Sequence, residues 1–194
     1  MLKDLLIQNR TRRRFYQNER ISPEILRELV DLTRYTPSTA NSQALKFRIV
    51  YTPEECSALF PHPIWAGALK DWDGPEEGER PAAYIVILCD KNLNKMYDDG
   101  IAALTMMLGA TERGLGGCIF GSVQREEAAK ALNIDMELYK IDLVLALGKP
   151  KEIVKIVDVP ESGCIDYYRD REGIHYVPKR ELKDILLPGN PKKA

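Results

Sequence analysis

The sequence predicts an α+β protein in which a central β-sheet is flanked by helices. Residues 82–89 and 141–147 are two short, mostly apolar runs, which are typical of central strands buried on both faces. Residues 100–111 carry no charge and are rich in good helix formers, so we expect a helix there. Because the strands and helices lack a regular βαβ spacing, the pattern favours a sheet core flanked by helices.

Length and charge narrow the class of protein. The 194 residues, 44% hydrophobic and 29% charged, fit a single domain, residues 1–194, with a real core. A net charge of −1 and a pI near 6.2 argue against nucleic acid or an acidic membrane as a partner. No apolar run reaches membrane-spanning length and the N-terminus lacks the apolar core of a signal peptide, so we expect a cytoplasmic protein.

The first half of the chain predicts three helices and one strand. Ser22 is a good N-cap and Pro23 suits the first helical position, so a helix begins there. The loop at 36–43 is dense in hydroxyl and amide side chains. The expected helices cover residues 2–9, 23–35 and 53–59, and the expected strand covers 47–51.

Residues 62–80 form the least regular stretch, which is rich in Pro, Gly and acidic residues. Trp65 and Trp72 are its large apolar anchors, and a linker would rarely carry two tryptophans. We therefore expect a lid-like excursion from the domain.

The helix expected at 100–111 is apolar on every side. Asp98 and Asp99 suit its positive N-terminal end, and Gly114 suits its C-terminal end. Such a helix cannot lie on the surface of a soluble domain, so sheet, other helices or a second subunit must cover it. The elements expected next are a glycine turn at Gly116 and Gly117 and a strand at 118–120.

The last third of the chain contains two further expected helices. Ser122 is the candidate cap of a helix that runs through 132. After residue 150 the composition turns polar and aromatic, so we expect 150–194 to form a C-terminal arm. Pro178 is expected to start a short terminal helix, and His175 is expected on a strand or at the surface.

Four arginines within residues 9–15 leave three interpretations open. The run can be a solvated charged turn, a nuclear-import or nucleic-acid patch, or an anion site, since guanidinium groups bind phosphate in a bidentate manner. Thr11 would add a hydroxyl donor to an anion site. A second basic pair, Lys179 and Arg180, stands near the other end of the chain.

Familiar catalytic and nucleotide-binding motifs are missing. The chain has neither G-x-G-x-x-G after a strand nor G-x-x-x-x-G-K-[ST]. The four cysteines include no C-x-x-C pair, and His62 and His175 are the only histidines, so neither a metal site nor a disulfide framework is expected. No side chain can be named as catalytic, which points to chemistry supplied by a cofactor.

Four segments, in order along the chain, resemble the FMN-dependent nitroreductase family. They are an arginine-rich segment after the first helix, a P-S-x-x-N-S-Q loop before a strand, a buried helix that ends in G-L-G, and a basic pair near the C-terminus. The residues that carry the resemblance are Arg10, Thr11, Arg13, Phe15, Pro37, Ser38, Asn41, Ser42, Gln43, Gly114, Leu115, Gly116, Lys179 and Arg180.

The resemblance implies a nitroreductase-like mixed or antiparallel sheet and an intertwined homodimer with FMN at the subunit interface. In similar proteins the arginine segment and the C-terminal basic pair reach the FMN phosphate and pyrimidine edge. The hydroxyl-rich loop comes from the other subunit to the ring, and the glycine turn faces the flavin N5 edge. The implied cofactor-binding residues are Arg10, Thr11, Arg13, Pro37, Ser38, Thr39, Asn41, Gln43, Gly116, Gly117, Lys179 and Arg180.

The implied activity is hydride transfer from NAD(P)H to FMN, followed by two-electron reduction of a small acceptor such as a nitro compound or a quinone. Asn9 stands where many members have arginine, and Ala44 and Leu45 stand where many have an aromatic residue. An FMN-binding, sensing or storage protein with little turnover is therefore the alternative. Arg12 and Arg14, which alternate with the implied phosphate ligands, are expected to point to solvent or to acidic residues.

Overall fold

The computed structural model describes residues 1–66, 69, 72–187 and 189, and these divide into two compact units. The first unit is Met1–Glu152 and the second is Ile153–Ala194. Their boundary lies close to the start of the C-terminal arm expected from residue 150. The union of the two units into the single expected domain stays a prediction.

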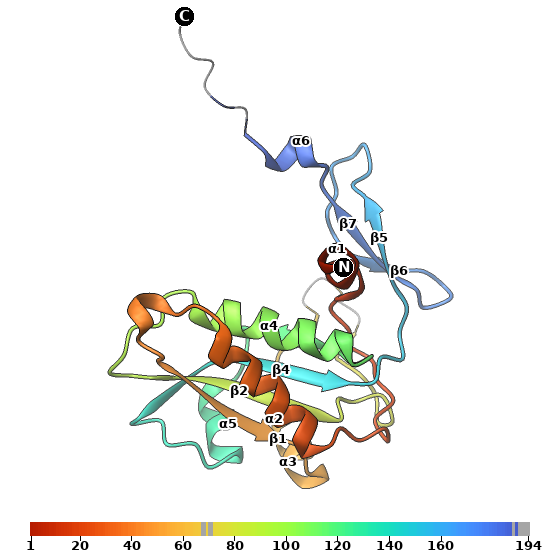
Figure 1. Ribbon diagram of the computed structural model, residues 1–194. Coiled ribbons are helices and arrows are strands. Elements are labelled where there is room, and N and C mark those ends of the chain that lie inside the picture. Colours follow the sequence, from red (N-terminus) through yellow and green to blue (C-terminus); the bar gives the residue numbers. More distant parts are fainter. Residues whose placement is uncertain (67–68, 70–71, 188, 190–194) are drawn as a thin grey trace, which may run out of the picture. The chain divides into compact units, whose positions relative to one another are not determined.

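The first unit is built on a four-stranded sheet in which every neighbouring pair is antiparallel (Figure 1). The strand order is β1-β2-β4-β3. The strands are β1 (Leu45–Val50), β2 (Ala83–Asp90), β3 (Gly116–Phe120) and β4 (Tyr139–Gly148). Every residue of β2 except Asp90 is buried, and Ala83 pairs with Leu147 of β4. The two expected central strands are therefore confirmed.

Helices cover both faces of this sheet (Figure 1). One apolar core joins the sheet to α2 and α4, and a second core joins the opposite face to α3 and α5. The helices of this unit are α1 (Leu2–Gln8), α2 (Pro23–Leu32), α3 (Pro53–Leu59), α4 (Asp98–Glu112) and α5 (Arg125–Ala131), with short 3₁₀ turns at Thr33–Tyr35 and Thr39–Asn41. The α+β prediction, an antiparallel sheet flanked by helices, is confirmed.

Helix caps show where local sequence signals succeed and where one fails. The Ser22 hydroxyl accepts a hydrogen bond from the Ile25 N–H at 3.4 Å, which confirms the predicted start of α2. The predicted cap Ser122 is wrong, because α5 begins at Arg125. The Ser122 carbonyl instead accepts from the Ile64 N–H, and Val123 forms a β-bridge with Pro63. These contacts hold the backbone extended beyond Ser122, so the helix starts later.

Helix α4 ends as its sequence predicts, but its own chain does not surround it. Gly114 adopts a left-handed φ of +69°, and the Leu115 N–H bonds back to the Ala110 carbonyl at 2.9 Å. The inward face of α4 is buried, whereas Ile101 and Leu104 are 37% and 45% exposed. Cover for this outer stripe by a second subunit stays a prediction.

The described part of 62–80 packs on the core side that holds α3 and α5. The Trp65 ring meets Phe120 edge-on at 4.7 Å between centroids and Trp72 at 6.2 Å. The two tryptophans are thus anchors, as expected. A lid function stays a prediction, and residues 67, 68, 70 and 71 lie outside the described residues.

The second unit is a small three-stranded sheet followed by a short helix. Its elements are β5 (Val154–Asp158), β6 (Tyr168–Arg169), β7 (His175–Lys179) and α6 (Leu182–Ile185), with β7 parallel to β5 and antiparallel to β6. His175 lies on β7, as expected, and is buried. The helix start expected at Pro178 is wrong, because Pro178 lies within β7 opposite Val157. The pairing of β6 with β7 covers only His175 and Tyr176, so Pro178 lies beyond it and its missing N–H removes no hydrogen bond to β6.

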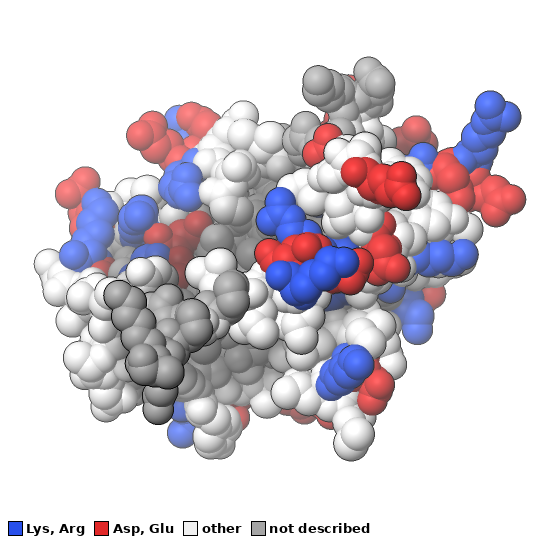
Figure 2. Space-filling model, turned by 90° about the horizontal axis from the view of Figure 1, so that it is seen from above, with Lys and Arg blue, Asp and Glu red and all other residues white. Residues whose placement is uncertain are grey.

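Basic and acidic side chains are interspersed on the face drawn in Figure 2.

No helix in the described part of the chain combines the length and the apolar character that crossing a bilayer requires.

Candidate functional site

Five of the predicted site residues meet where the arginine run joins β3. We call this place the arginine end; it comprises Arg10, Thr11, Arg13, Gly116 and Gly117. Thr11 forms a parallel β-bridge with Gly117, and the next residue's N–H donates to the Gly117 carbonyl at 2.8 Å. The run is therefore fixed to the sheet by its backbone.

Two of the four arginines are held by acidic residues of their own unit. Arg14 forms an ion pair with Glu79, whose carboxylate also lies 2.8 Å from the Lys151 ammonium. The hydrogen bond from Arg14 and the neighbouring lysine lower the pKa of Glu79 to about 2. Arg12 donates to the main-chain carbonyl of Glu152 at 2.6 Å, and the Glu152 carboxylate offsets its charge. Arg14 thus points to an acidic side chain, as predicted, whereas Arg12 points to a main-chain carbonyl. The backbone N–H of Arg13 donates to the Glu152 carboxylate, and contact of Arg13 with a phosphate stays a prediction.

Arg10 differs from Arg12 and Arg14, because no carboxylate among the described residues balances its charge. Its Nη2 donates to the Leu6 carbonyl at 2.6 Å, while its buried Nε has no hydrogen-bond partner there. Burial lowers the pKa of Arg10 and no nearby acid opposes that shift. The adjacent Thr11 is exposed. Arg10 and Thr11 thus offer a cation and a hydroxyl to an anion.

Gly116 and Gly117 lie in β3, so the predicted glycine turn is wrong and the strand begins two residues earlier than expected. A Cβ on Gly117 would stand 2.2 Å from the Ala146 carbonyl oxygen, and one on Gly116 would stand 2.9 Å from Arg12 Cγ. Packing within the chain therefore already requires glycine at both positions. Their contact with a flavin stays a prediction.

The remaining predicted residues of the first unit gather at the N-terminus of α4. We call this place the loop end; it comprises residues 36–43 and Asp98. The buried Asp98 carboxylate accepts from the Thr39 N–H at 3.0 Å and from the Thr39 hydroxyl at 2.9 Å. The Ser42 hydroxyl donates to the Asn94 carbonyl at 2.6 Å. The loop is therefore tied to α4 and to the segment before it.

The loop backbone is strained. Ala40, Asn41 and Gln43 all have left-handed φ values, of 49°, 53° and 49°. The Ser38 hydroxyl accepts from the Gln43 N–H at 3.3 Å and closes the turn. Such strain persists where surrounding contacts hold it, and it clusters at functional sites. The exposed Asn41 side chain is left at the crest of the turn.

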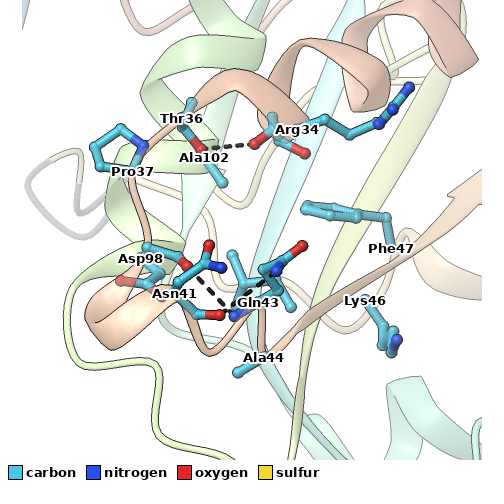
Figure 3. A pocket seen from close by; sticks show the side chains of 13 residues that line it. Arg34, Thr36, Pro37, Asn41, Gln43, Ala44, Lys46, Phe47, Asp98 and Ala102 are labelled. Atoms are coloured by element: carbon cyan, nitrogen blue, oxygen red, sulfur yellow. Dashed lines mark hydrogen bonds between the residues drawn. The ribbon is translucent and has the colours of Figure 1, made fainter.

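A cavity of about 320 Å³ opens beside this loop. Figure 3 shows the side chains of the loop, of β1 and of the first turns of α4 around the same hollow. Its lining includes Pro37, Ser38, Asn41, Gln43, Ala44, Leu45, Phe47, Asp98 and Ala102. Thr33, Arg34, Thr36 and Lys46 complete the lining, so polar, charged and apolar side chains all border a cavity large enough for a small molecule.

Asp98 is the residue of the candidate site that the sequence did not predict. Its position predicted only a favourable charge at the start of a helix. Its contact with Thr39 spans 59 positions of the chain, and no local pattern indicates such a pairing. At the other extreme, Lys179 and Arg180 are exposed at the end of β7 in the second unit, and their approach to Arg10 stays a prediction.

The described residues offer no metal cluster, and two of the buried thiols are kept protonated by their surroundings. They contain no group of three or more His, Cys, Asp or Glu residues that could hold a metal ion. Burial raises the pKa of both Cys56 and Cys118 to about 11, so these thiols stay protonated near neutral pH.

Solved structures of several proteins share this fold. An FMN-dependent nitroreductase from Clostridium difficile is 21% identical over 76% of this chain and 86% of that chain, with a TM-score of 0.62. An iodotyrosine deiodinase bound to FMN and 3-iodo-L-tyrosine is 21% identical over 78% of this chain and 90% of that chain, with a TM-score of 0.65. A putative NADH oxidase from Clostridium acetobutylicum is 21% identical over 76% and 88%, with a TM-score of 0.59. At such identities the likeness shows the fold alone.

The sequence itself matches the model of the nitroreductase family over residues 7–98 and 90–149. These ranges take in most of the chain, including the arginine end, the loop end and α4. The chain therefore belongs to the nitroreductase family.

Proposed function

We propose that this protein is an FMN-dependent NAD(P)H oxidoreductase that works as a homodimer and reduces a nitro compound, a quinone or a related small acceptor. The observation that carries the proposal is the placement of the arginine end and the loop end at opposite ends of α4. This helix has 15 residues, and at about 1.5 Å per residue its ends are about 22 Å apart. The two groups of predicted FMN ligands are thus well separated within one chain.

A second copy would bring the two groups together. The outer stripe of α4 with Ile101 and Leu104 is apolar and exposed, and it lies between the two ends. If two copies pack α4 against α4 around a two-fold axis with the helices antiparallel, each loop end faces the partner's arginine end. Two equivalent sites result. A stable dimer of this kind should bury more than about 2,000 Å² in total.

The side chains present fit an FMN molecule. Arg10 and Thr11 suit its phosphate, because the Arg10 charge is balanced by no acid among the described residues and its buried Nε is unpaired there. The loop end suits the ring, because Thr39 engages the Asp98 carboxylate and Asn41 is exposed beside the cavity. Lys179 and Arg180 would add positive charge from the second unit.

When bound, FMN supplies a ring that takes up two electrons from NAD(P)H and passes them to the acceptor. The task of the protein is to bind and orient this ring. Arg10 and Thr11 would hold the phosphate, and Asn41 would place an amide at the ring. Because Asp98 and Ser42 fix the loop to the rest of the chain, the donors are set in place before the cofactor arrives.

The test is to purify the full chain and record its visible spectrum before and after anaerobic addition of NADH or NADPH. A yellow protein that bleaches rapidly, and whose colour returns with a nitro compound or a quinone, is the expected result. Yellow protein that fails to bleach with either nucleotide would establish the FMN-holding alternative. Colourless protein that gains no flavin on incubation with FMN would overturn the proposal.

A further inference from the structure

A second cavity, of about 200 Å³, lies on the opposite face of the sheet from the loop end. It is enclosed by the segment that leads into α2, by α3 and by the start of β2. Tyr84 of β2 forms one wall, and Arg20 and Arg80 contribute to the others. No residue of the arginine end or the loop end lines it.

This cavity contains hydrogen-bond donors that the protein leaves unused. Tyr84 is 1% exposed, and its hydroxyl has no hydrogen-bond partner in the described part of the chain. The Nε of Arg80 is likewise buried without a partner there. A buried donor without an acceptor is destabilising, so two such donors beside one cavity suit an acceptor supplied by a ligand.

The arginine groups around the cavity are held in place. The Arg80 guanidinium lies 4.2 Å from the centroid of the Phe60 ring, and its backbone N–H donates to the Gln17 side chain at 3.1 Å. Arg20 donates to the Tyr51 carbonyl, which anchors it at the rim. Charged donors fixed in this way bind an anion without a large loss of side-chain freedom.

The other lining groups do not supply the missing acceptor. The Cys56 thiol is directed at the Val50 and Ala82 carbonyls, at 3.8 and 3.6 Å. Glu77 is exposed, and it is the one carboxylate among the lining residues. The lining is thus rich in donors and carries a net positive charge.

We propose that this cavity binds a small oxyanion, a carboxylate or phosphate group, through the Tyr84 hydroxyl, the Arg80 Nε–H and the Arg20 guanidinium. Its volume is below the range typical of drug-sized ligands, which suits an anion of a few heavy atoms. The site is separate from the proposed flavin site, so the two proposals stand or fall independently.

The test is calorimetric titration of the purified full chain, in whatever flavin state it is obtained, with malonate and, separately, with inorganic phosphate. Sodium chloride at matched ionic strength controls for screening. Saturable binding of one of the two anions is expected, and the tighter one identifies the class. Tyr84→Phe, which removes a single hydroxyl, should weaken that binding about tenfold, the equivalent of one hydrogen bond. Arg80→Gln should weaken it more.

Matched controls come from outside the cavity. Tyr35→Phe alters a tyrosine that is 77% exposed, and Arg27→Gln alters an exposed arginine of α2, so neither should change the affinity. Absence of saturable binding by both anions would overturn the proposal. So would an affinity for Tyr84→Phe equal to that of the unaltered chain.

Discussion

The arginine end and the loop end differ in how their charged side chains are balanced. Beside the arginine end, Arg14 pairs with Glu79 and Arg12 contacts Glu152, while no acid among the described residues balances the charge of Arg10. At the loop end, Asp98 and Asp99 are engaged by Thr39 and Lys95 within the chain. The acidic residues at the loop end are therefore balanced within the chain, whereas the Arg10 charge is balanced by no acid among the described residues.

The two ends also differ in how they are held. The arginine end is fixed by backbone contacts to β3, where an added Cβ at Gly117 would collide with the Ala146 carbonyl. The loop end is fixed by side chains, chiefly the Asp98 carboxylate and the Ser42 hydroxyl. Substitutions therefore alter the loop end one group at a time, whereas the arginine end changes chiefly through its charges.

The largest effect is expected from Leu104→Lys. This substitution should prevent dimer formation and thereby separate the arginine end of one copy from the loop end of the other. Leu104 is 45% exposed in the single chain, so lysine costs little there, but an unpaired ammonium in the proposed interface costs roughly several kcal/mol. We expect a folded, flavin-free monomer by sedimentation and circular dichroism. Leu138→Lys, at a position 50% exposed, should stay dimeric and yellow. Met107 is buried within its own chain, so its substitution would not test the dimer.

Arg10→Ala should impair phosphate binding at the arginine end and leave the loop end unchanged. Loss of one charged hydrogen bond is expected to weaken FMN by about 1.5–3 kcal/mol, roughly 10- to 150-fold, and to leave riboflavin unchanged. Fluorescence titration of the apoprotein with each flavin measures the difference. Equal losses for both ligands would show that Arg10 does not contact the phosphate.

Glu79→Gln should change how the free energy of unfolding depends on pH, because it removes the carboxylate that pairs with Arg14 and Lys151. Arg14 and Lys151 lower the pKa of Glu79 from 4.5 to about 2, so its carboxylate stabilises the fold fully above pH 4.5. This contribution, on the order of 2 kcal/mol, disappears as the pH falls from 4.5 to 2. Urea unfolding across that range should show a shallower pH dependence for Glu79→Gln. Parallel curves for the two proteins would contradict the pairing.

Asp98→Asn should loosen the loop end alone. The amide retains one acceptor but loses the charge that holds both Thr39 donors, so the free energy of unfolding should fall by about 1–2 kcal/mol. Urea unfolding measures this change. The visible circular dichroism of bound flavin should change with it if the loop contacts the ring. Asp99→Asn, which loses the ion pair with Lys95 at the next position, should also lower stability but should leave the flavin signal unchanged. An equal change of the flavin signal in both variants would argue against a specific role of Asp98.

The smallest effect on stability is expected at Asn41. Its side chain is exposed, so Asn41→Ala should cost at most about 1 kcal/mol, mainly because alanine tolerates the left-handed backbone less well. Asn41→Gly removes the same amide without that backbone cost. If Asn41 faces the flavin, both variants should slow reduction by NAD(P)H in stopped-flow measurements on a yellow dimer. An unchanged rate in both would leave the residue a purely structural role in the turn.

The sequence by itself determined the elements whose causes are local. Apolar runs of strand length located β2 and β4, and Ser22 with Pro23 located the start of α2. Gly114 located the end of α4, since only a left-handed residue closes that helix. Each of these signals depends on propensity and periodicity within a few residues, which is information that a sequence carries directly.

Tertiary structure decided everything that depends on distant partners. Ser122 has the chemistry of a cap, but a bridge between Pro63 and Val123 keeps its backbone extended. Four similar arginines stand in one run, and only the positions of Glu79 and Glu152 determine that Arg10 is left unbalanced. The anchor of the loop end, Asp98, lies 59 positions from Thr39. Charge balance and loop anchoring are properties of groups that folding brings together, so they follow from the packed structure and not from any local pattern.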